Sequence, residues 1–210
     1  MNGEWLRPVG DDSFRCWWPG DDLQYQEYHD GEWGRPVVDD SRLFEKLSLE
    51  GFQAGLSWLT ILRKRENFRS AFHQFDIQIV SRFTSKDVDK LMSDAGIVRH
   101  RGKIEAVINN AQCAIDLLDD VESLSGYFWS FAPDAPFGRE EAPTHPSGVP
   151  STSPSATRLS KDLKKRGWKF VGPTTMYSFM QSMGLVNDHV PGCWVRDECE
   201  TSRVAIKRRQ

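Results

Sequence analysis

The strongest constraint on this sequence is a set of four potential metal ligands divided between its two ends. Cys16 and His29 lie near the start of the 210-residue chain, and His189 and Cys193 lie near its end. Two thiolates and two imidazoles form a ligand set that satisfies tetrahedral Zn²⁺. If one ion binds all four side chains, the fold must bring the two ends of the chain together.

The composition is that of a globular protein of the reducing cytosol. Hydrophobic residues make up 39% and charged residues 27% of the chain, which excludes disordered and fibrous classes. No apolar run approaches the roughly 20 residues that cross a bilayer, and the first residues lack the pattern of a signal peptide. We therefore expect a cytoplasmic protein with no membrane partner, in which the cysteines are metal ligands or buried thiols.

Apolar periodicity predicts an almost entirely helical chain. Apolar side chains recur at helical spacing in residues 41–49, 50–62, 85–94, 103–118 and 174–183. Ser153 and Pro154 mark the start of a further, basic helix. No stretch shows sustained alternation, so strands are not expected. Residues 133–154 are rich in Pro, Ser, Thr and Gly, which predicts a long loop or lid.

Residues 94–104 have the pattern of two helices joined by a glycine-flanked hairpin. Gly96 and Gly102 border the turn, and Arg99, Arg101 and Lys103 lie within or beside it. Glycine permits close approach of a ligand, and the start of the second helix offers free N–H groups to an anion. The pattern fits a sequence-independent clamp on the DNA backbone, and it equally fits an ordinary turn between packed helices.

Aromatic side chains crowd the first 60 residues together with one acidic residue in an apolar stretch. They include Trp17, Trp18, Tyr25, Tyr28, Trp33 and Trp58. Glu50 lies among leucines, where a carboxylate needs a partner or a role. These residues would form part of a core with a satisfied buried acid. The alternative is a pocket for an extruded nucleobase, which needs aromatic stacking and a polar group that reads the base.

Five strings together resemble the 3-methyladenine DNA glycosylase I family, of the Tag type. They are YHDGEWG at 28–34, LEGFQAGLSW at 49–58, RKREN at 63–67, IVRHRGKI at 97–104 and FMQSMGLVNDH at 179–189. The resemblance covers roughly residues 15–194 in the same order. It implies an all-α fold of the helix-hairpin-helix DNA glycosylase superfamily, with a zinc site that joins the N- and C-terminal segments.

The resemblance also implies roles for individual residues. The metal ligands would be Cys16, His29, His189 and Cys193, around a structural Zn²⁺. The base-binding residues would be Trp18, Tyr28, Trp33, Glu50 and Trp58. The DNA backbone would be bound by Gly96, Arg99, Arg101, Gly102 and Lys103. Glu50 is the catalytic candidate, either as the group that activates water or only as the group that recognises the base.

The implied activity is hydrolytic excision of 3-methyladenine from alkylated double-stranded DNA, which leaves an abasic site. Free 3-methyladenine would be the product, and we expect the protein to act on DNA as a monomer. Asp116, Asp119 and Asp120 follow the hairpin, where many related glycosylases place a catalytic aspartate. The Tag type is understood to lack that residue, so none of the three is a candidate. Trp17 departs from the family, which usually has a small residue there.

We expect one helical glycosylase domain over residues 1–195, followed by a flexible tail over 196–210. Within it, the hairpin unit would span about 85–118, and residues 15–60 and 150–195 would form a zinc-stapled lobe. Two alternatives stay open. One is a zinc-stapled module that binds DNA without catalysis, and the other is a glycosylase that prefers a different alkylated purine.

Overall fold

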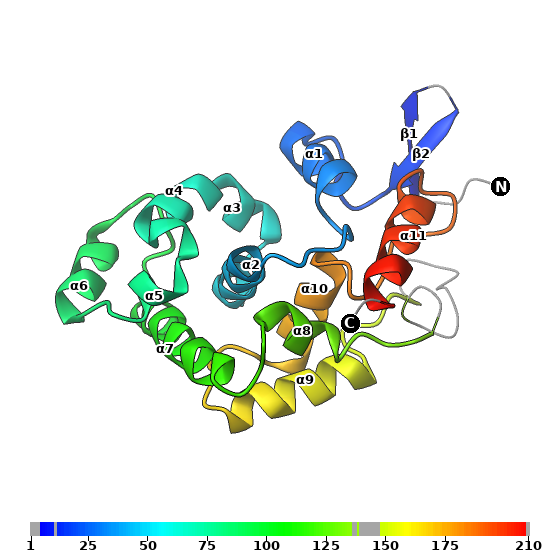
Figure 1. The fold of residues 1–210 in the computed structure, drawn as a ribbon. Helices are drawn as coiled ribbons and strands as arrows, with labels where there is room; N and C mark the ends of the chain where they lie inside the picture. Colours follow the sequence, from blue (N-terminus) through cyan, green and yellow to red (C-terminus); the bar gives the residue numbers. More distant parts are fainter. Residues whose placement is uncertain (1–4, 11, 136–137, 139–147, 209–210) are drawn as a thin grey trace.

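Helices make up most of the computed structural model, which describes residues 5–10, 12–135, 138 and 148–208 (Figure 1). Its elements in chain order are β1 (Leu6–Gly10), β2 (Ser13–Cys16), α1 (Leu23–Gly31), α2 (Asp40–Gln53), α3 (Trp58–Arg63), α4 (Arg65–Ala71), η1 (His73–Phe75), α5 (Ile77–Val80), α6 (Ser85–Ser93), α7 (Arg101–Leu118), α8 (Leu124–Trp129), α9 (Pro154–Lys165), α10 (Pro173–Ser182) and α11 (Arg196–Lys207). Within the described ranges, no helix combines the length and the apolar character that crossing a bilayer requires.

A short β-hairpin at the N-terminus departs from the expected all-α fold. β1 and β2 pair antiparallel, with Leu6 opposite Cys16. Strands of five and four residues are too short to display a sustained alternation, which is why the sequence pattern missed them. The Trp194 N–H donates to the Phe14 carbonyl over 2.8 Å. The hairpin therefore carries Cys16 to the C-terminal segment, next to Cys193.

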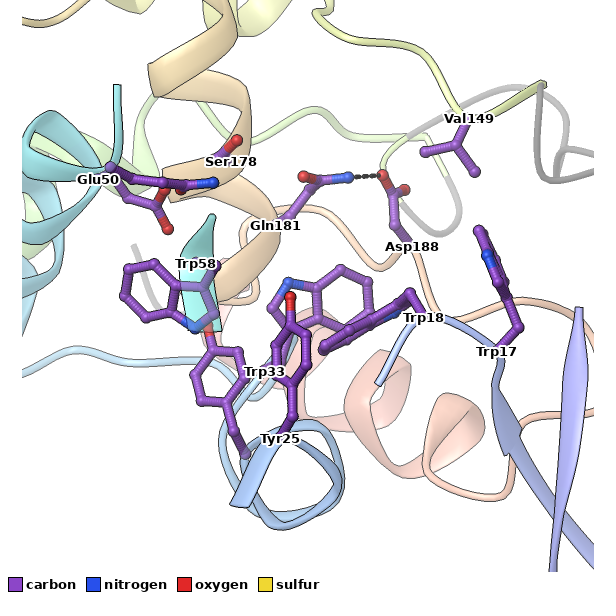
Figure 2. A pocket seen from close by; sticks show the side chains of 12 residues that line it. Trp17, Trp18, Tyr25, Trp33, Glu50, Trp58, Val149, Ser178, Gln181 and Asp188 are labelled. Atoms are coloured by element: carbon purple, nitrogen blue, oxygen red, sulfur yellow. Dashed lines mark hydrogen bonds between the residues drawn. The ribbon is translucent and has the colours of Figure 1, made fainter. Parts of the chain in front are cut away.

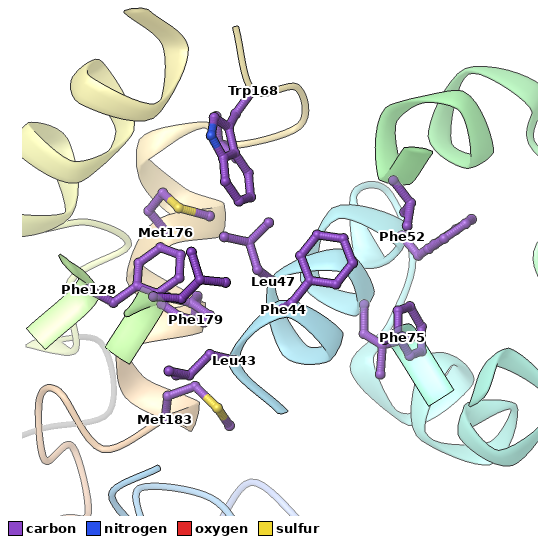
Figure 3. Packing of buried hydrophobic residues seen from close by; sticks show 14 of the residues in the cluster. Leu43, Phe44, Leu47, Phe52, Phe75, Phe128, Trp168, Met176, Phe179 and Met183 are labelled. Carbon is purple, nitrogen blue, oxygen red and sulfur yellow. The ribbon is translucent and has the colours of Figure 1, made fainter. Parts of the chain in front are cut away.

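Helix α2 lies at the centre of the molecule, between α3–α7 on one side and α8 and α10 on the other (Figure 1). Its buried face includes Phe44 and Leu47, which pack with Phe128, Met176 and Phe179 (Figure 3). Burying side chains of this size stabilises the fold by roughly 1.5–3 kcal/mol each. This packing fixes α2, and with it the position of every functional side chain that the helix carries.

The helix predicted to continue past residue 53 is interrupted before α3. Gly55 has a φ of +81°, in the region that glycine adopts without strain. The Ser57 side chain then accepts from the Thr60 N–H and caps α3, a typical N-cap. The interruption turns the chain, so that Trp58 faces the same part of the molecule as Glu50.

The remaining predicted helices are present, with caps that explain their ends. The Ser153 side chain caps α9, whose first residue is Pro154, as predicted. Thr84 and Asp87 form a capping box at the start of α6. α6 and α7 flank a turn over residues 94–100, which is the predicted two-helix arrangement.

The expectation of a flexible C-terminal tail is wrong for residues 196–207, which form α11. Cys199 and Arg203 are buried on this helix, and Arg203 binds Glu200 and the Pro133 carbonyl. The buried residues Arg196, Cys199 and Arg203 follow helical spacing, which explains why this segment forms a helix although most of its residues are polar. Half of the predicted loop over 133–154 lies outside the described residues.

Candidate active site and metal cluster

Cys16, His29, His189 and Cys193 converge in one buried cluster, as their pattern predicted. Their ligand atoms all lie within 4.8 Å of one another. The Nδ1 atom of His189 lies 3.7 Å from the Cys16 sulfur, 3.5 Å from the Cys193 sulfur and 3.2 Å from Nε2 of His29. The fold therefore brings the two chain ends together at the four side chains that could hold a metal.

The spacing of these atoms matches tetrahedral coordination. At a tetrahedral angle, bond lengths of about 2.3 Å to sulfur and about 2.0 Å to nitrogen place a sulfur and a nitrogen about 3.5 Å apart, and two nitrogens about 3.3 Å apart. Three of the four S···N separations are 3.5, 3.6 and 3.7 Å, the N···N separation is 3.2 Å, and every pair of ligand atoms lies within 4.8 Å. The donor set and its geometry thus fit a zinc ion with all four positions filled by protein.

Groups outside the cluster hold both histidine rings in the required orientation. The Nδ1 atom of His29 lies 2.7 Å from Asp30, which is paired with Arg15, and the Nε2 atom of His189 lies 2.9 Å from the Trp33 carbonyl. Such partners fix the ring tautomer and raise the basicity of the coordinating nitrogen. Hydrogen bonds from Cys16 and from both histidines lower the pKa of the Cys193 thiol, which favours the thiolate that binds metal.

Gly34 shows how closely the chain is shaped around the cluster. Its φ is +76°, and a Cβ built there would lie 2.7 Å from Nε2 of His189. Both observations require glycine at this position.

The cluster shares a wall with an aromatic cavity of about 260 Å³. The Trp18 ring lies 5.2 Å from the His29 ring and 5.1 Å from the Trp33 ring, and Trp33 lies 4.7 Å from the His189 ring. Edge-to-face contacts at these distances are favourable. The metal-type ligands therefore support two of the tryptophans that face the cavity, while the cavity itself holds none of the ligands.

Figure 2 shows that the cavity has an aromatic side and a polar side. It is lined by Trp17, Trp18, Tyr25, Tyr28, Trp33, Glu50, Gln53, Trp58, Val149, Ser178, Gln181 and Asp188. The structure thus brings together all five predicted base-binding residues. Trp17 packs against Trp5 with ring centroids 6.4 Å apart and against the buried hydrophobic group that includes Cys16 and Cys193. Small-molecule pockets start at roughly 300 Å³, so this volume suits one small planar ligand.

Glu50 is the acidic residue on the polar side and is only 5% exposed. Burial raises its pKa, and the Lys46 ammonium and the Ser182 hydroxyl oppose that rise. The Lys46 nitrogen lies 3.4 Å from the carboxylate and donates to the Tyr28 hydroxyl over 2.6 Å. Burial likewise raises the pKa of Tyr28, so the phenol keeps its proton. The cavity therefore offers a carboxylate acceptor and a phenol among aromatic rings.

Two of the tryptophans that line the cavity have indole N–H groups without an acceptor among the described residues. The Nε1 atoms of Trp18 and Trp58 are buried and have no acceptor within the described part of the chain. Buried donors in native proteins are nearly always paired. A cavity with a carboxylate, a phenol and aromatic ring faces is suited to a flat ligand that carries both hydrogen-bond donors and acceptors.

Arg99 and Lys103 of the hairpin region differ in exposure, and the contact of Arg99 with the DNA backbone stays a prediction. Arg99 is exposed. Lys103 is 7% exposed, and its ammonium donates to the carbonyls of Phe52 and Ala54. The predicted contact of the Lys103 side chain with a DNA phosphate is therefore wrong, because this ammonium caps the end of α2. The Arg101 side chain is exposed and pairs with Asp89 at 2.6 Å.

Several residues at the site were missed from the sequence, although a signal existed for most of them. Ser178 and Gln181 are three residues apart on α10 and therefore share a face. Lys46 precedes Glu50 by one helical turn, which is the spacing of an ion pair. Asp188 directly precedes a metal-type ligand and accepts from Tyr177 and Gln181 at 2.7 and 2.6 Å.

Comparisons with known proteins agree with this geometry. The model of the methyladenine glycosylase family matches residues 18–197. The chain is 50% identical to DNA-3-methyladenine glycosylase 1 of Escherichia coli K12 over 179 residues, which are 85% of this chain and 95% of that protein. It is also similar to a crystal structure of 3-methyladenine DNA glycosylase I, with a TM-score of 0.80, 46% identity and coverage of 86% and 98%. A variant of that enzyme type in complex with 3-methyladenine gives a TM-score of 0.78 at 39% identity and covers 84% and 94%.

Proposed function

Because the chain belongs to the methyladenine glycosylase family and is an N-glycosyl hydrolase, we propose that it excises 3-methyladenine from alkylated double-stranded DNA. The observation that carries the proposal is the aromatic cavity of about 260 Å³ with the buried Glu50 on its polar side. A similar enzyme binds 3-methyladenine in its solved structure. The products would be the free base and an abasic site.

The reaction needs little acid catalysis, because methylation at N3 already gives the base a positive charge. The bond between N9 and C1′ breaks, and its electron pair moves to the base and neutralises that charge. A water oxygen then bonds to C1′, and one proton leaves to solvent. The protein must extrude the nucleotide from the stack and hold it. Trp58 would stack on the base, while Trp18 and Trp33 wall the cavity.

Selectivity would rest on Glu50. Adenine presents an amino donor where guanine presents a carbonyl acceptor. An ionised Glu50 accepts from the adenine amino group, whereas it repels the guanine oxygen. Removing a hydrogen-bond match in a buried site disfavours the wrong base strongly, because the polar groups are then left unpaired.

The four-residue cluster would hold a structural Zn²⁺ through Cys16, His29, His189 and Cys193. Four protein ligands leave no open position for water, which is the pattern of structural zinc rather than of catalytic zinc. The ion would stabilise the wall of the cavity, and Glu50 and the aromatic residues would act on the base.

DNA would be held as a duplex by a protein monomer through the hairpin between α6 and α7. The start of α7 offers backbone N–H groups at Arg101 and Gly102, and Gly96 keeps the turn narrow. Free N–H groups and the helix dipole favour a phosphate at this end. Arg99 adds an exposed positive charge.

The decisive assay is incubation of radiomethylated duplex DNA with the purified protein, followed by chromatography of the released bases. We expect a peak of 3-methyladenine and retention of methylguanines in the polymer. Release of no base would favour a DNA-binding module without catalysis. A methylguanine peak would favour a glycosylase with a shifted preference.

A further inference from the structure

Lys46 is a buried cation directly behind the proposed base pocket. It lies on α2, one turn before Glu50, and is 6% exposed. Its nitrogen lies 2.6 Å from the Tyr28 hydroxyl, 3.4 Å from the Glu50 carboxylate and 3.2 Å from the centroid of the Trp58 ring. All three partners line the cavity, whereas Lys46 does not.

We propose that Lys46 is a positioning residue that acts through Glu50 and Tyr28, so that the cavity presents one hydrogen-bond acceptor together with one donor. This inference rests on the proposed excision of 3-methyladenine. Lys46 would then influence which base is bound, although its side chain does not contact the base.

The contact with Tyr28 fixes the role of the phenol. An ammonium can only donate, so the Tyr28 oxygen must accept from Lys46. The proton of the phenol must then point elsewhere, and within the described residues this hydroxyl has no other hydrogen-bond partner. Because Tyr28 lines the cavity, its O–H is left to donate to a ligand there.

The contact with Glu50 gives the carboxylate its positive partner. The other charged groups near this pair are satisfied by one another: Arg65 pairs with Glu32 at 2.6 Å, and Arg69 pairs with Glu45 at 2.9 Å. The other titratable groups that line the cavity with Glu50 are Tyr25, Tyr28 and Asp188. Burial raises the pKa of both phenols, which stay neutral, and Asp188 accepts from Tyr177 and Gln181. Lys46 is thus the cation that compensates the buried carboxylate.

An acceptor and a donor together complement the adenine edge. Adenine presents its amino group beside the unprotonated N7 atom, whereas guanine presents two acceptors at the corresponding positions. Glu50 would accept from the amino group, and Tyr28 would donate to a ring nitrogen. Because Lys46 contacts Glu50 and Tyr28 rather than the base, departure of the base leaves these contacts unchanged.

The charges of the pair define a pH window for excision. Burial raises the pKa of Glu50, so the carboxylate is lost at a higher pH than in water as the solution is acidified. Burial lowers the pKa of Lys46 to about 8, so the ammonium is lost above that pH. The value of kcat/KM reports these groups in the free enzyme and should therefore fall on both sides of neutrality.

The test compares the pH profile of 3-methyladenine release for the wild type, Lys46→Met, Glu50→Gln and the double variant. An opposite charge at this distance lowers a carboxyl pKa by about 1–3 units, so Lys46→Met should move the acid limb upward by about one unit or more. At pH 7 we expect at least a tenfold loss of kcat/KM. Arg42→Met is the matched control, because it removes an exposed cation from the same helix and should leave the profile unchanged.

The outcomes separate this inference from the proposed function. If the wild type releases no base, the proposed function fails first. If the wild type is active but Lys46→Met has an unchanged profile, or combines additively with Glu50→Gln, Lys46 has only a packing role. A shifted acid limb and strongly non-additive effects support the inference. If Lys46→Met does not fold, Lys46→Gln serves as the uncharged variant in the same comparison.

Discussion

The metal-type cluster and the aromatic cavity share a wall but satisfy their polar groups in opposite ways. In the cluster, each histidine nitrogen and both sulfurs have partners at 2.7–3.7 Å. At the cavity, the indole donors of Trp18 and Trp58 have no acceptor within the described residues, and Glu50 is buried beside Lys46.

This difference separates a structural site from a binding site. Four protein ligands around one ion leave no position for substrate or water, so the cluster serves to fix the two chain ends. The cavity instead presents a buried carboxylate, a phenol and aromatic ring faces to a ligand. The predictions that follow test whether stability belongs to the cluster and base release belongs to the cavity.

The largest expected effect is the loss of stability in Cys193→Ala. In the chain-entropy model, a crosslink that closes so long a loop contributes about 5 kcal/mol. The melting temperature should therefore fall by roughly 10–20 °C, together with loss of bound zinc by elemental analysis. Cys113→Ala is the control, because this half-buried thiol lies outside the cluster. Full stability of the wild type after complete zinc removal would contradict the structural role.

Glu50→Gln should show the opposite pattern to Cys193→Ala, with a large loss of base release and little loss of stability. We expect at least a 100-fold loss of 3-methyladenine release, or about 2.7 kcal/mol of transition-state stabilisation, because an amide cannot supply the negative charge. The melting temperature should change far less than in Cys193→Ala. Single-turnover release from alkylated DNA measures the effect, and unchanged release would remove Glu50 from the site.

Much of this division was predictable from the sequence, because it depends on residue types with narrow chemistry. Two cysteines and two histidines that converge form a typical zinc ligand set, and an acid among leucines requires an explanation. The long strings around Tyr28 and Glu50 indicated the family. The helices at 41–49 and 103–118 followed from periodicity, since their apolar faces are buried.

The predictions that were wrong share one physical cause. A local sequence pattern allows more than one structure, and contacts with distant parts of the chain determine which one forms. Lys103 has the sequence context of a DNA-binding residue, yet its ammonium donates to backbone carbonyls at the end of α2. The residues of α11 look like a polar tail, yet Cys199 and Arg203 are buried. The β-hairpin is too short for alternation to show, and it is stabilised by its contact with residues near Cys193.

Asp30→Asn tests the support of the cluster without removing a ligand. Although burial opposes it, the pairing with Arg15 and His29 lowers the pKa of Asp30. The stabilisation from this carboxylate is therefore complete above about pH 4 and is lost as the pH falls through the lowered value. Loss of such a partner weakens metal binding by about 10–100-fold. Competition with a chelator would measure the change, and an unchanged zinc affinity would mean that Asp30 does not orient His29.

The smallest expected effect concerns the hairpin. Arg99→Ala should reduce the slope of log affinity against log salt by about one, because one phosphate contact is lost. Lys103→Met should leave that slope unchanged and lower the melting temperature instead, since its ammonium caps α2. Fluorescence anisotropy with duplex DNA at several salt concentrations distinguishes the two, and a reversed result would restore Lys103 as the phosphate contact.

The central claim is that the cluster provides stability and the cavity provides base release. Its most direct test measures single-turnover release of 3-methyladenine by Cys193→Ala and Glu50→Gln at a temperature where both are folded. The account predicts that Cys193→Ala keeps release within about tenfold of the wild type, while Glu50→Gln loses at least 100-fold. Intact release by Glu50→Gln together with abolished release by folded Cys193→Ala would contradict it, because the chemistry would then depend on the cluster.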